Sequence, residues 1–158
     1  MKVATLAIII KDNQVLLGFK KKGEIGSQTV NGPGGKVEEG ETLEECLARE
    51  TKEELGIELD EDKLEKTAVI TFFAKGVADF EVHIFRTSSF SGTPVETLDM
   101  IPTWYDIDNL PFEKMLESDR EWFEKAIRGE KFNAKVYYSD RASGFERIEF
   151  LPFAFNGK

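Results

Sequence analysis

The chain has 158 residues, of which 41% are hydrophobic and 32% charged, and its formal net charge is −9. A chain of this length buries about 70% of its unfolded surface, so we expect residues 1–158 to fold as one domain without cross-links. The acidic balance excludes the basic face that duplex nucleic acid or an anionic membrane requires, although a nucleotide can still bind if a metal screens its phosphates.

The amino-terminal segment, MKVATLAIII, contains a short apolar run. It is too short for a signal peptide and lacks a small-residue cleavage site, and no stretch of the sequence has the 18 or more apolar residues that a membrane span requires. We therefore predict two buried strands, at 2–10 and 14–20. Lys11, Asp12 and Asn13 are expected to join them as a hairpin, because Asp and Asn favour turns.

The second strand ends in a basic cluster, Lys20, Lys21 and Lys22. Such a cluster is by default a solubility patch, but it leads directly into a loop at 23–33, so a lysine that reaches a polyphosphate is an alternative interpretation. The glycines at positions 32, 34, 35 and 40 allow sharp turns and close backbone approach. A loop that precedes a helix can also present free amide groups to phosphate.

A helix is predicted from about Thr42 to Leu55. Thr42 with Glu45 three residues later forms a capping box, and Gly56 can adopt the left-handed conformation that ends a helix. The apolar stripe of this helix begins with Leu43, Cys46 and Leu47. Cys46 is the only cysteine of the chain, which excludes an internal disulfide and favours a buried, inert thiol in a reducing cytoplasm.

Three carboxylates, Glu50, Glu53 and Glu54, continue this stripe one turn further along the helix. Like charges at such spacings destabilise a helix, and a divalent cation would remove the penalty. Oxygen ligands without His or Cys beside them suit Mg²⁺ or Mn²⁺ rather than Zn²⁺. The alternative is an ordinary solvated face on a Glu-rich helix.

The segments at 64–74 and 80–86 are the next predicted strands. In the second, alternation places Phe80, Val82 and Ile84 on one face and His83 on the other. His83 is the only histidine, and a lone histidine on a strand is more often structural than a catalytic base.

The last third of the chain is expected to contain a loop at 92–98, a short strand at 102–106, a second helix and strands at 132–138 and 145–151. Ser118, with Glu121 three residues later, is predicted to cap the helix. Its apolar face consists of Trp122, Phe123, Ala126 and Ile127, which indicates a core position. A mixed sheet with one long helix and one shorter helix in the C-terminal half is packed most economically as a layered α/β/α sandwich.

The segment from 35 to 57 resembles the Nudix box: Gly35, five residues, Glu41, seven residues, then RETKEELGI at 49–57. Its departure from the pattern is Thr51, where the family has a bulky apolar residue. We expect a small packing loss there and intact chemistry. The resemblance continues through VLLGFKKKG, NGPGGKVEEGE, EVHIF, GTPVE and WYDIDNLPF, and is closest to the MutT-homologue branch, the oxidised purine nucleoside triphosphatases.

The resemblance implies a Nudix fold and a Mg²⁺-dependent hydrolase, with Mn²⁺ as a possible substitute. It assigns Glu50, Glu53 and Glu54 to metal binding, and one of Glu53 and Glu54 to the general base. It also implies metal ligands at the Gly34 carbonyl and at Asp99. Arg49 and Glu41 are expected to pair and fix the loop against the helix.

The resemblance also implies a substrate site that recognises a purine base. It assigns Asn31 and Asp119 to the base edge, with Ser118 replacing a first aspartate and Leu116 replacing a stacking tryptophan. A Ser118–Asp119 pair presents a hydroxyl beside a carboxylate, so we expect recognition to loosen without being lost. The further predicted substrate residues are Thr5, Lys20, Phe73 and Phe80.

We therefore expect a monomeric, cytoplasmic enzyme that converts oxidised purine nucleoside triphosphates such as 8-oxo-dGTP to the monophosphate and pyrophosphate. The alternatives are a Nudix pyrophosphatase acting on ADP-ribose, a diadenosine polyphosphate or NADH, or a binding module without catalysis. ADP-ribose types often carry a proline soon after the box, whereas this chain has none between Ile57 and Pro94. All three glutamates are retained, which disfavours the non-catalytic alternative.

Overall fold

The computed structural model describes residues 1–23 and 27–154. The predicted amino-terminal hairpin is confirmed: β1 (Lys2–Lys11) pairs in antiparallel register with β2 (Gln14–Lys20). Asp12 and Asn13 form the turn with φ angles of 52° and 62°. Positive φ at both central residues twists the backbone in the sense of the flanking strands, which explains why Asp and Asn stand there.

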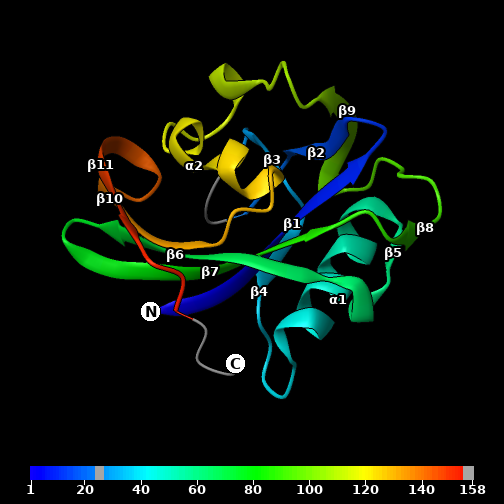
Figure 1. Ribbon diagram of the computed structural model, residues 1–158, viewed down its shortest axis with the longest axis horizontal. Coiled ribbons are helices and arrows are strands. Elements are labelled where there is room, and N and C mark those ends of the chain that lie inside the picture. Colours follow the sequence, from blue (N-terminus) through cyan, green and yellow to red (C-terminus); the bar gives the residue numbers. More distant parts are fainter. Residues whose placement is uncertain (24–26, 155–158) are drawn as a thin grey trace.

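A curled mixed sheet forms the centre of the molecule (Figure 1). Its strand order is β11-β10-β6-β7-β1-β2-β3, with β4 on β1 and β9 on β2. The β1–β7 and β10–β6 pairs are parallel and the other pairs are antiparallel. The predicted later strands are β6 (Glu65–Ala74), β7 (Val77–Thr87), β9 (Met100–Asp106), β10 (Phe132–Asp140) and β11 (Ser143–Leu151).

Short elements also lie in the predicted loop at 23–33 and in segments for which the sequence predicts no helix or strand. β3 (Val30–Asn31) and β4 (Gly34–Lys36) occupy the glycine-rich segment, and β5 (Glu58–Leu59) pairs with β8 (Phe90–Ser91). Part of the predicted loop, residues 24–26, lies outside the described residues. Two- and three-residue strands have no periodicity of their own and form because a longer neighbour supplies the hydrogen-bond partners.

The first helix, α1 (Leu43–Leu55), has the predicted boundaries. The Thr42 hydroxyl accepts a hydrogen bond from the Glu45 N–H at 3.0 Å, and the Glu45 carboxylate accepts one from the Thr42 N–H at 2.9 Å. Gly56 ends the helix at φ 74°. The buried side of α1 packs in a cluster whose members include Leu47, Leu55, Ala7, Ile9, Leu16 and Phe85.

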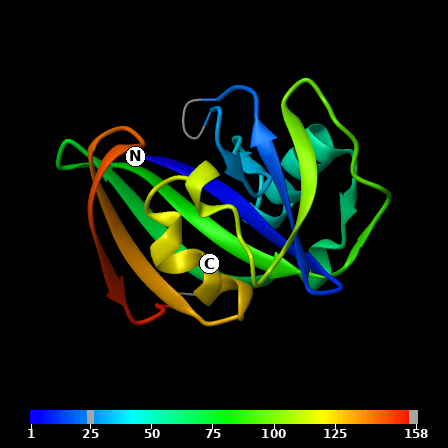
Figure 2. The same ribbon diagram turned by 90° about the horizontal axis from the view of Figure 1, so that it is seen from above.

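The second helix, α2 (Asp119–Ile127), covers the other face of the sheet (Figure 2). Its apolar side packs in a second cluster that includes Trp122, Phe123, Ile84, Ile8 and Val136. Alternation along β7 therefore sends Ile84 toward α2 and Phe85 toward α1. The predicted α/β/α sandwich is confirmed. Neither helix of the described chain combines the length and apolar character needed to cross a bilayer.

The predicted capping box of α2 is wrong. Ser118 has helical dihedral angles, φ −68° and ψ −18°, and its side chain makes no capping hydrogen bond. Its Oγ instead accepts a hydrogen bond from the Tyr138 hydroxyl at 2.9 Å. The Tyr138 side chain, from a distant strand, thus engages the hydroxyl that would otherwise cap the helix. The four-residue capping-box pattern contains no information about this contact.

Three short turns connect the remaining elements. Two 3-10 turns, η1 (Glu61–Lys63) and η2 (Phe112–Lys114), precede β6 and α2. The turn between β10 and β11 includes Ala142, which adopts φ 56° there.

Candidate active site

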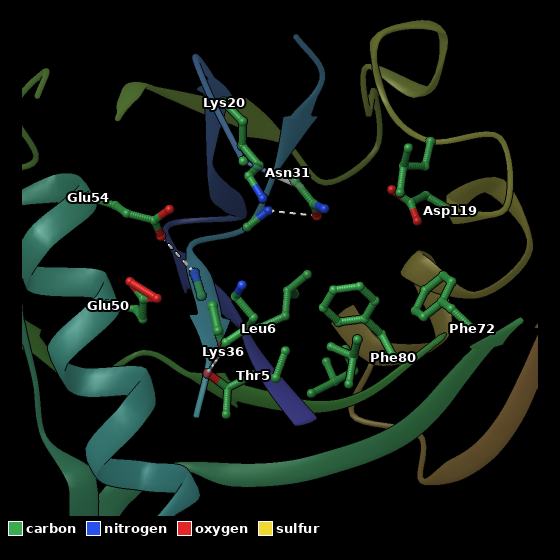
Figure 3. A pocket seen from close by; sticks show the side chains of 18 of the residues that line it. Thr5, Leu6, Lys20, Asn31, Lys36, Glu50, Glu54, Phe72, Phe80 and Asp119 are labelled. Carbon is green, nitrogen blue, oxygen red and sulfur yellow. Dashed lines mark hydrogen bonds between the residues drawn. The ribbon is translucent and has the colours of Figure 1, made fainter. Parts of the chain in front are cut away.

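A cavity of about 280 Å³ lies between the C-terminal half of α1 and the start of α2. Strands β1, β2, β3, β4, β6 and β7 all contribute residues to its wall. Glu50 and Glu54 stand at one end and Asp119 at the other, with Lys20 and Asn31 between them (Figure 3). The cavity thus has an acidic end and an end whose wall is apolar; the apolar lining consists of Leu6, Phe72, Phe80, Val82, Ile84, Leu116 and Trp122.

The acidic end is formed where α1 meets the glycine backbone of β4. Glu54 is 8% exposed, and its Oε1 accepts a hydrogen bond from the Gly34 N–H at 2.8 Å. A Cβ at Gly35 would overlap Oε2 of Glu50. A larger residue at 35 would therefore displace the Glu50 carboxylate from this position.

Burial changes the acidity of both carboxyls. It raises the pKa of Glu54 to about 7, with Asp99 and Glu53 adding to the rise and the Gly34 N–H and Lys20 opposing it. Burial, and next the charge of Glu54, also raises the pKa of Glu50. Two charges in this place repel each other and are poorly hydrated, so a cation between them would be strongly favoured.

The acidic end fits a hard divalent cation on its donor chemistry, because every candidate side-chain ligand is a carboxylate oxygen. Asp99 lines the same cavity and pairs with Lys22 Nζ at 3.0 Å. Within the described ranges, no three His, Cys, Asp or Glu side chains are already gathered as a metal site. A cation at Glu50 and Glu54 would therefore take further ligands from backbone, water or substrate phosphate.

Glu53 differs from the expectation that it shares the inward stripe. Its side chain is 53% exposed, and its Oε2 lies 3.3 Å from Nη1 of Arg49. Successive helical residues point 100° apart, so Glu53 and Glu54 cannot both face the centre of the cavity. Glu53 lies at the border of the inward face of α1. For a residue at this border, the helical periodicity of the sequence does not distinguish an inward from an outward side chain.

Arg49 and Glu41 lie together as predicted. The guanidinium donates two hydrogen bonds to the Glu41 carboxylate, at 2.6 and 3.0 Å, and a third to the Lys36 carbonyl at 3.2 Å. The hydrogen bond from Arg49 is the main cause that lowers the pKa of Glu41 to about 2. A bidentate pair of this kind fixes the direction of both side chains, and here it ties the segment before α1 to the helix.

The other end of the cavity contains Asn31 and Asp119. The Asn31 side-chain Oδ1 accepts a hydrogen bond from the Gly32 N–H at 2.9 Å, which leaves the amide nitrogen to face the cavity. Asp119 is 1% exposed, and its Oδ2 has no hydrogen-bond partner among the described residues. Burial raises the pKa of Asp119 to about 7, while the Leu116 backbone and Trp122 oppose the rise. A buried oxygen without a partner is costly, and a ligand that hydrogen-bonds to Oδ2 recovers that cost.

Phe73 does not lie where it was expected. It stacks on Tyr137, with ring centroids 4.7 Å apart, while its neighbour Phe72 lines the cavity. The register between β6 and β7 shifts between these two residues. Adjacent strand residues face opposite sides of the sheet, so an error of one position moves a side chain out of the site.

Three other residues also differ from their expected roles. The Thr5 hydroxyl is directed to the α1 side, 3.3 Å from Cys46 Sγ, although Thr5 forms part of the cavity wall. Ser118 is fully buried and its hydroxyl is engaged by Tyr138. Trp122, predicted as core alone, also lines the cavity. Its Nε1 has no hydrogen-bond partner in the described chain, which sequence periodicity cannot reveal.

His83 agrees with its predicted structural role. Its Nε2 lies 2.8 Å from Oε1 of Glu81 on the same strand, and burial lowers its pKa. It lies on the face of β7 opposite Ile84, which lines the cavity. The single histidine therefore faces away from the cavity, on the side of the sheet that packs against α1.

The chain matches a family model described as a NUDIX domain over residues 1–126. It belongs to the Nudix hydrolase family. Among its relatives, an oxidized purine nucleoside triphosphate hydrolase of Danio rerio is 40% identical over 132 residues, 83% of each chain. One of the same name from Mus musculus is 37% identical over 141 residues, 89% of this chain and 88% of the relative.

The fold of this Nudix hydrolase is also that of a solved structure, a MutT protein from Bacillus halodurans. The two superpose with a TM-score of 0.80 over 95% of this chain and 97% of the other. At 20% identity the likeness concerns the fold alone. It extends past residue 126 and therefore includes α2 in full, β10 and β11.

The buried charge of Glu54 leads to a prediction for the metal-free protein. The pKa of Glu54 rises from 4.5 to about 7 on folding. Between these pH values the unfolded chain has released a proton that the folded chain retains, so stability should fall as pH rises through this window. Glu54→Gln should therefore melt at a higher temperature than the parent above pH 7 and at a similar temperature near pH 4.

The measurement is thermal unfolding from pH 4 to 8 with a chelator present. Glu44→Gln is the matched control: it makes the same chemical change on the first turn of the same helix, away from Glu54, and should leave this pH dependence in place. A Glu54→Gln protein that is less stable than the parent above pH 7 would contradict the assignment of a buried, repelled charge.

Proposed function

We propose that this Nudix hydrolase converts oxidised purine nucleoside triphosphates such as 8-oxo-dGTP to the monophosphate and pyrophosphate, and so sanitises the nucleotide pool. The observation that carries the proposal is the two-ended cavity, with buried carboxylates at one end and, at the other, the buried Asp119 carboxyl, whose Oδ2 has no hydrogen-bond partner among the described residues. The names of the two animal relatives support the same substrate class.

The acidic end is the place for the triphosphate. Nudix hydrolases generally use a divalent metal, and Mg²⁺ or Mn²⁺ held there would neutralise phosphate charge and lower the pKa of an attacking water. Glu50 and Glu54, with Asp99 and the Gly34 carbonyl, are the residues that would hold it. Lys20 lines the same stretch of wall, where its charge also stabilises the ionised form of Glu54, and can contact a phosphate oxygen.

A carboxylate of α1 would take the proton of the attacking water. Glu54 is well placed, because the Gly34 N–H fixes one of its oxygens and leaves the other available. The family resemblance also makes Glu53 a candidate for the general base. Because the Glu53 side chain points outward, we favour Glu54 for this role. Arg49 supports both by holding Glu41 and the segment that leads into α1.

The apolar end is the place for the base. Phe80 and Leu116 can cover the faces of a purine ring, while the Asn31 amide and the Asp119 carboxyl contact its edge. Ser118 cannot share this task, because its hydroxyl is bound to Tyr138. One carboxyl and one amide recognise a base less stringently than a pair of carboxyls would, so discrimination among purines should be modest.

The proposal also includes the domain organisation, oligomeric state, binding partners and cellular compartment. Residues 1–158 act as one Nudix domain, since β10 continues the same sheet that carries the box. We expect the enzyme to be a monomer, to bind neither duplex nucleic acid nor membrane, and to work in a reducing cytoplasm. The single cysteine and the net charge of −9 support these expectations.

Metal dependence and the role of Glu54 can be tested together. Hydrolysis should disappear when a chelator removes divalent metal. Glu54→Gln should lower kcat by about 100-fold or more with the fold retained, because positioned proton transfer contributes on this scale. Glu53→Gln should lose less.

Steady-state release of pyrophosphate and circular dichroism are the two measurements. Glu44→Gln removes one negative charge from the first turn of the same helix and should keep the parent's rate. It therefore shows whether a loss of activity is specific to Glu54. Wild-type turnover in Glu54→Gln, or equal activity without metal, would refute the catalytic role of this end.

The base preference can be tested with 8-oxo-dGTP, 2-oxo-dATP, dGTP and dCTP. The oxidised purines should give the highest kcat/KM. Asp119→Ala should lower kcat/KM for 8-oxo-dGTP by about 5- to 100-fold, because an unmade hydrogen bond at the base edge costs on the order of 1–3 kcal/mol. Its effect on dGTP should be smaller. Asp108→Ala, the same change at an exposed position, should have none; a pyrimidine preference, or an Asp119 effect equal for all four, would overturn the assignment.

A further inference from the structure

The start of α2 is held by β10 rather than by its own side chains. The Ser118 N–H donates to the Tyr138 hydroxyl at 3.0 Å, and that hydroxyl donates to Ser118 Oγ at 2.9 Å. Both residues are buried. The phenol therefore uses its donor and one acceptor position on a single residue, which fixes the backbone and the side chain of Ser118 together.

The next residue in the chain is Asp119, whose carboxyl faces the cavity (Figure 3). Its backbone N–H donates to the Leu116 carbonyl at 3.0 Å, so Leu116 to Asp119 form one tight turn. Leu116 and Asp119 are cavity residues, whereas Ser118 is bound on the other side of the turn. A turn anchored at Ser118 leaves little freedom for the side chain that follows it.

Tyr138 is itself rigidly placed. Its ring lies against Phe145 with centroids 5.6 Å apart, and it packs in the core that includes Trp122 and Phe123. Its strand pairs with β6, the strand that supplies Phe72 to the cavity. The Tyr138 hydroxyl thus connects the sheet that forms the cavity wall to the turn that carries the polar group of the apolar end.

We propose that Tyr138 is a positioning residue for base recognition: by binding Ser118 on both its N–H and its Oγ, it aims the Asp119 carboxyl at the base edge. The inference rests on the proposed function in taking a purine nucleotide as the ligand. It adds that Tyr138, which does not touch the base, controls affinity for the base through Asp119.

A purely structural role for the hydrogen-bonded pair makes a different prediction. Loss of the Tyr138 hydroxyl would then lower stability and affect every ligand equally. A positioning role affects only ligands that carry a base, and only while Asp119 is present to be positioned. The two roles are therefore separated by a ligand without a base and by a double-mutant cycle.

The experiment compares the full-length parent with Tyr138→Phe, Asp119→Asn and the double variant. Tyr138→Phe keeps the ring and removes only the hydroxyl. We measure kcat and KM for 8-oxo-dGTP and dGTP, and the dissociation constants of 8-oxo-dGMP, dGMP and pyrophosphate. Tyr137→Phe is the matched control, because it removes the same atom from the neighbouring residue, whose ring stacks on Phe73 outside the cavity.

The expected result for Tyr138→Phe is about a five- to tenfold rise in KM for 8-oxo-dGTP and in the dissociation constant of 8-oxo-dGMP, the scale of one mispositioned hydrogen bond. Its kcat should change by less than about twofold, and pyrophosphate binding should be unchanged. In the Asp119→Asn background the Tyr138 substitution should add almost nothing. Ser118→Ala, which keeps the N–H bond to Tyr138, should have a smaller effect of the same kind.

Equal losses for nucleotides and pyrophosphate, additive effects of the Tyr138 and Asp119 substitutions, or the same loss in Tyr137→Phe would each overturn the inference. If Tyr138→Phe does not fold, Ser118→Ala replaces it in the double-mutant cycle with Asp119→Asn. A parent that binds 8-oxo-dGMP but hydrolyses none of the triphosphates would refute the proposed function, while the monophosphate binding cycle would still decide the role of Tyr138. A parent that binds no purine nucleotide would refute both.

Discussion

The close approach of two buried carboxylates to a glycine backbone is the constraint on which this site depends. Glu50 can stand at the end of the cavity because Gly35 has no Cβ to exclude its carboxylate, and Glu54 because the Gly34 N–H donates a hydrogen bond to one of its oxygens. The capping box, the Gly56 end of α1 and the Arg49–Glu41 pair all serve to hold the helix and β4 in this relation. The cost is electrostatic repulsion, which a bound cation would relieve.

The sheet sets the distance between the two ends of the cavity. α1 packs on one face and α2 on the other, and the strands between them place an apolar wall from the carboxylates of α1 to Asp119 (Figure 3). A triphosphate and a base attached to one sugar require both ends at once. Under the proposed function, the fold places the phosphate end of the cavity at α1 and the base end at α2.

Much of this arrangement could be predicted from sequence, because its signals are local. The hairpin at Asp12 and Asn13, the bounds of α1, and the alternation along β7 each depend on a few neighbouring residues whose periodicity or turn chemistry is unambiguous. Glu50 and Glu54 were found because acids occupied positions that the helical period reserves for core. The pairing of Arg49 with Glu41 followed from the box.

The remaining features depend on contacts that no local pattern contains. Ser118 has the sequence signature of a cap, but Tyr138, from a strand 20 residues later, provides the competing hydrogen bonds. Trp122 has the period of a core residue and is one, yet its ring edge also reaches the cavity. In each case tertiary packing decided between positions that sequence reasoning treats as equal.

The central claim is that Glu50 and Glu54 form a cation site prepared by the fold, and the most direct measurement is the melting temperature as a function of Mg²⁺ concentration. It should be made with the parent and with Glu54→Gln, alone and with 8-oxo-dGMP and pyrophosphate. At ten times its dissociation constant, Mg²⁺ should raise the melting temperature of the parent by about 3–6 °C, because it binds the folded state only, and should have far less effect on Glu54→Gln. A parent whose melting temperature does not respond to Mg²⁺ under either condition would contradict the account.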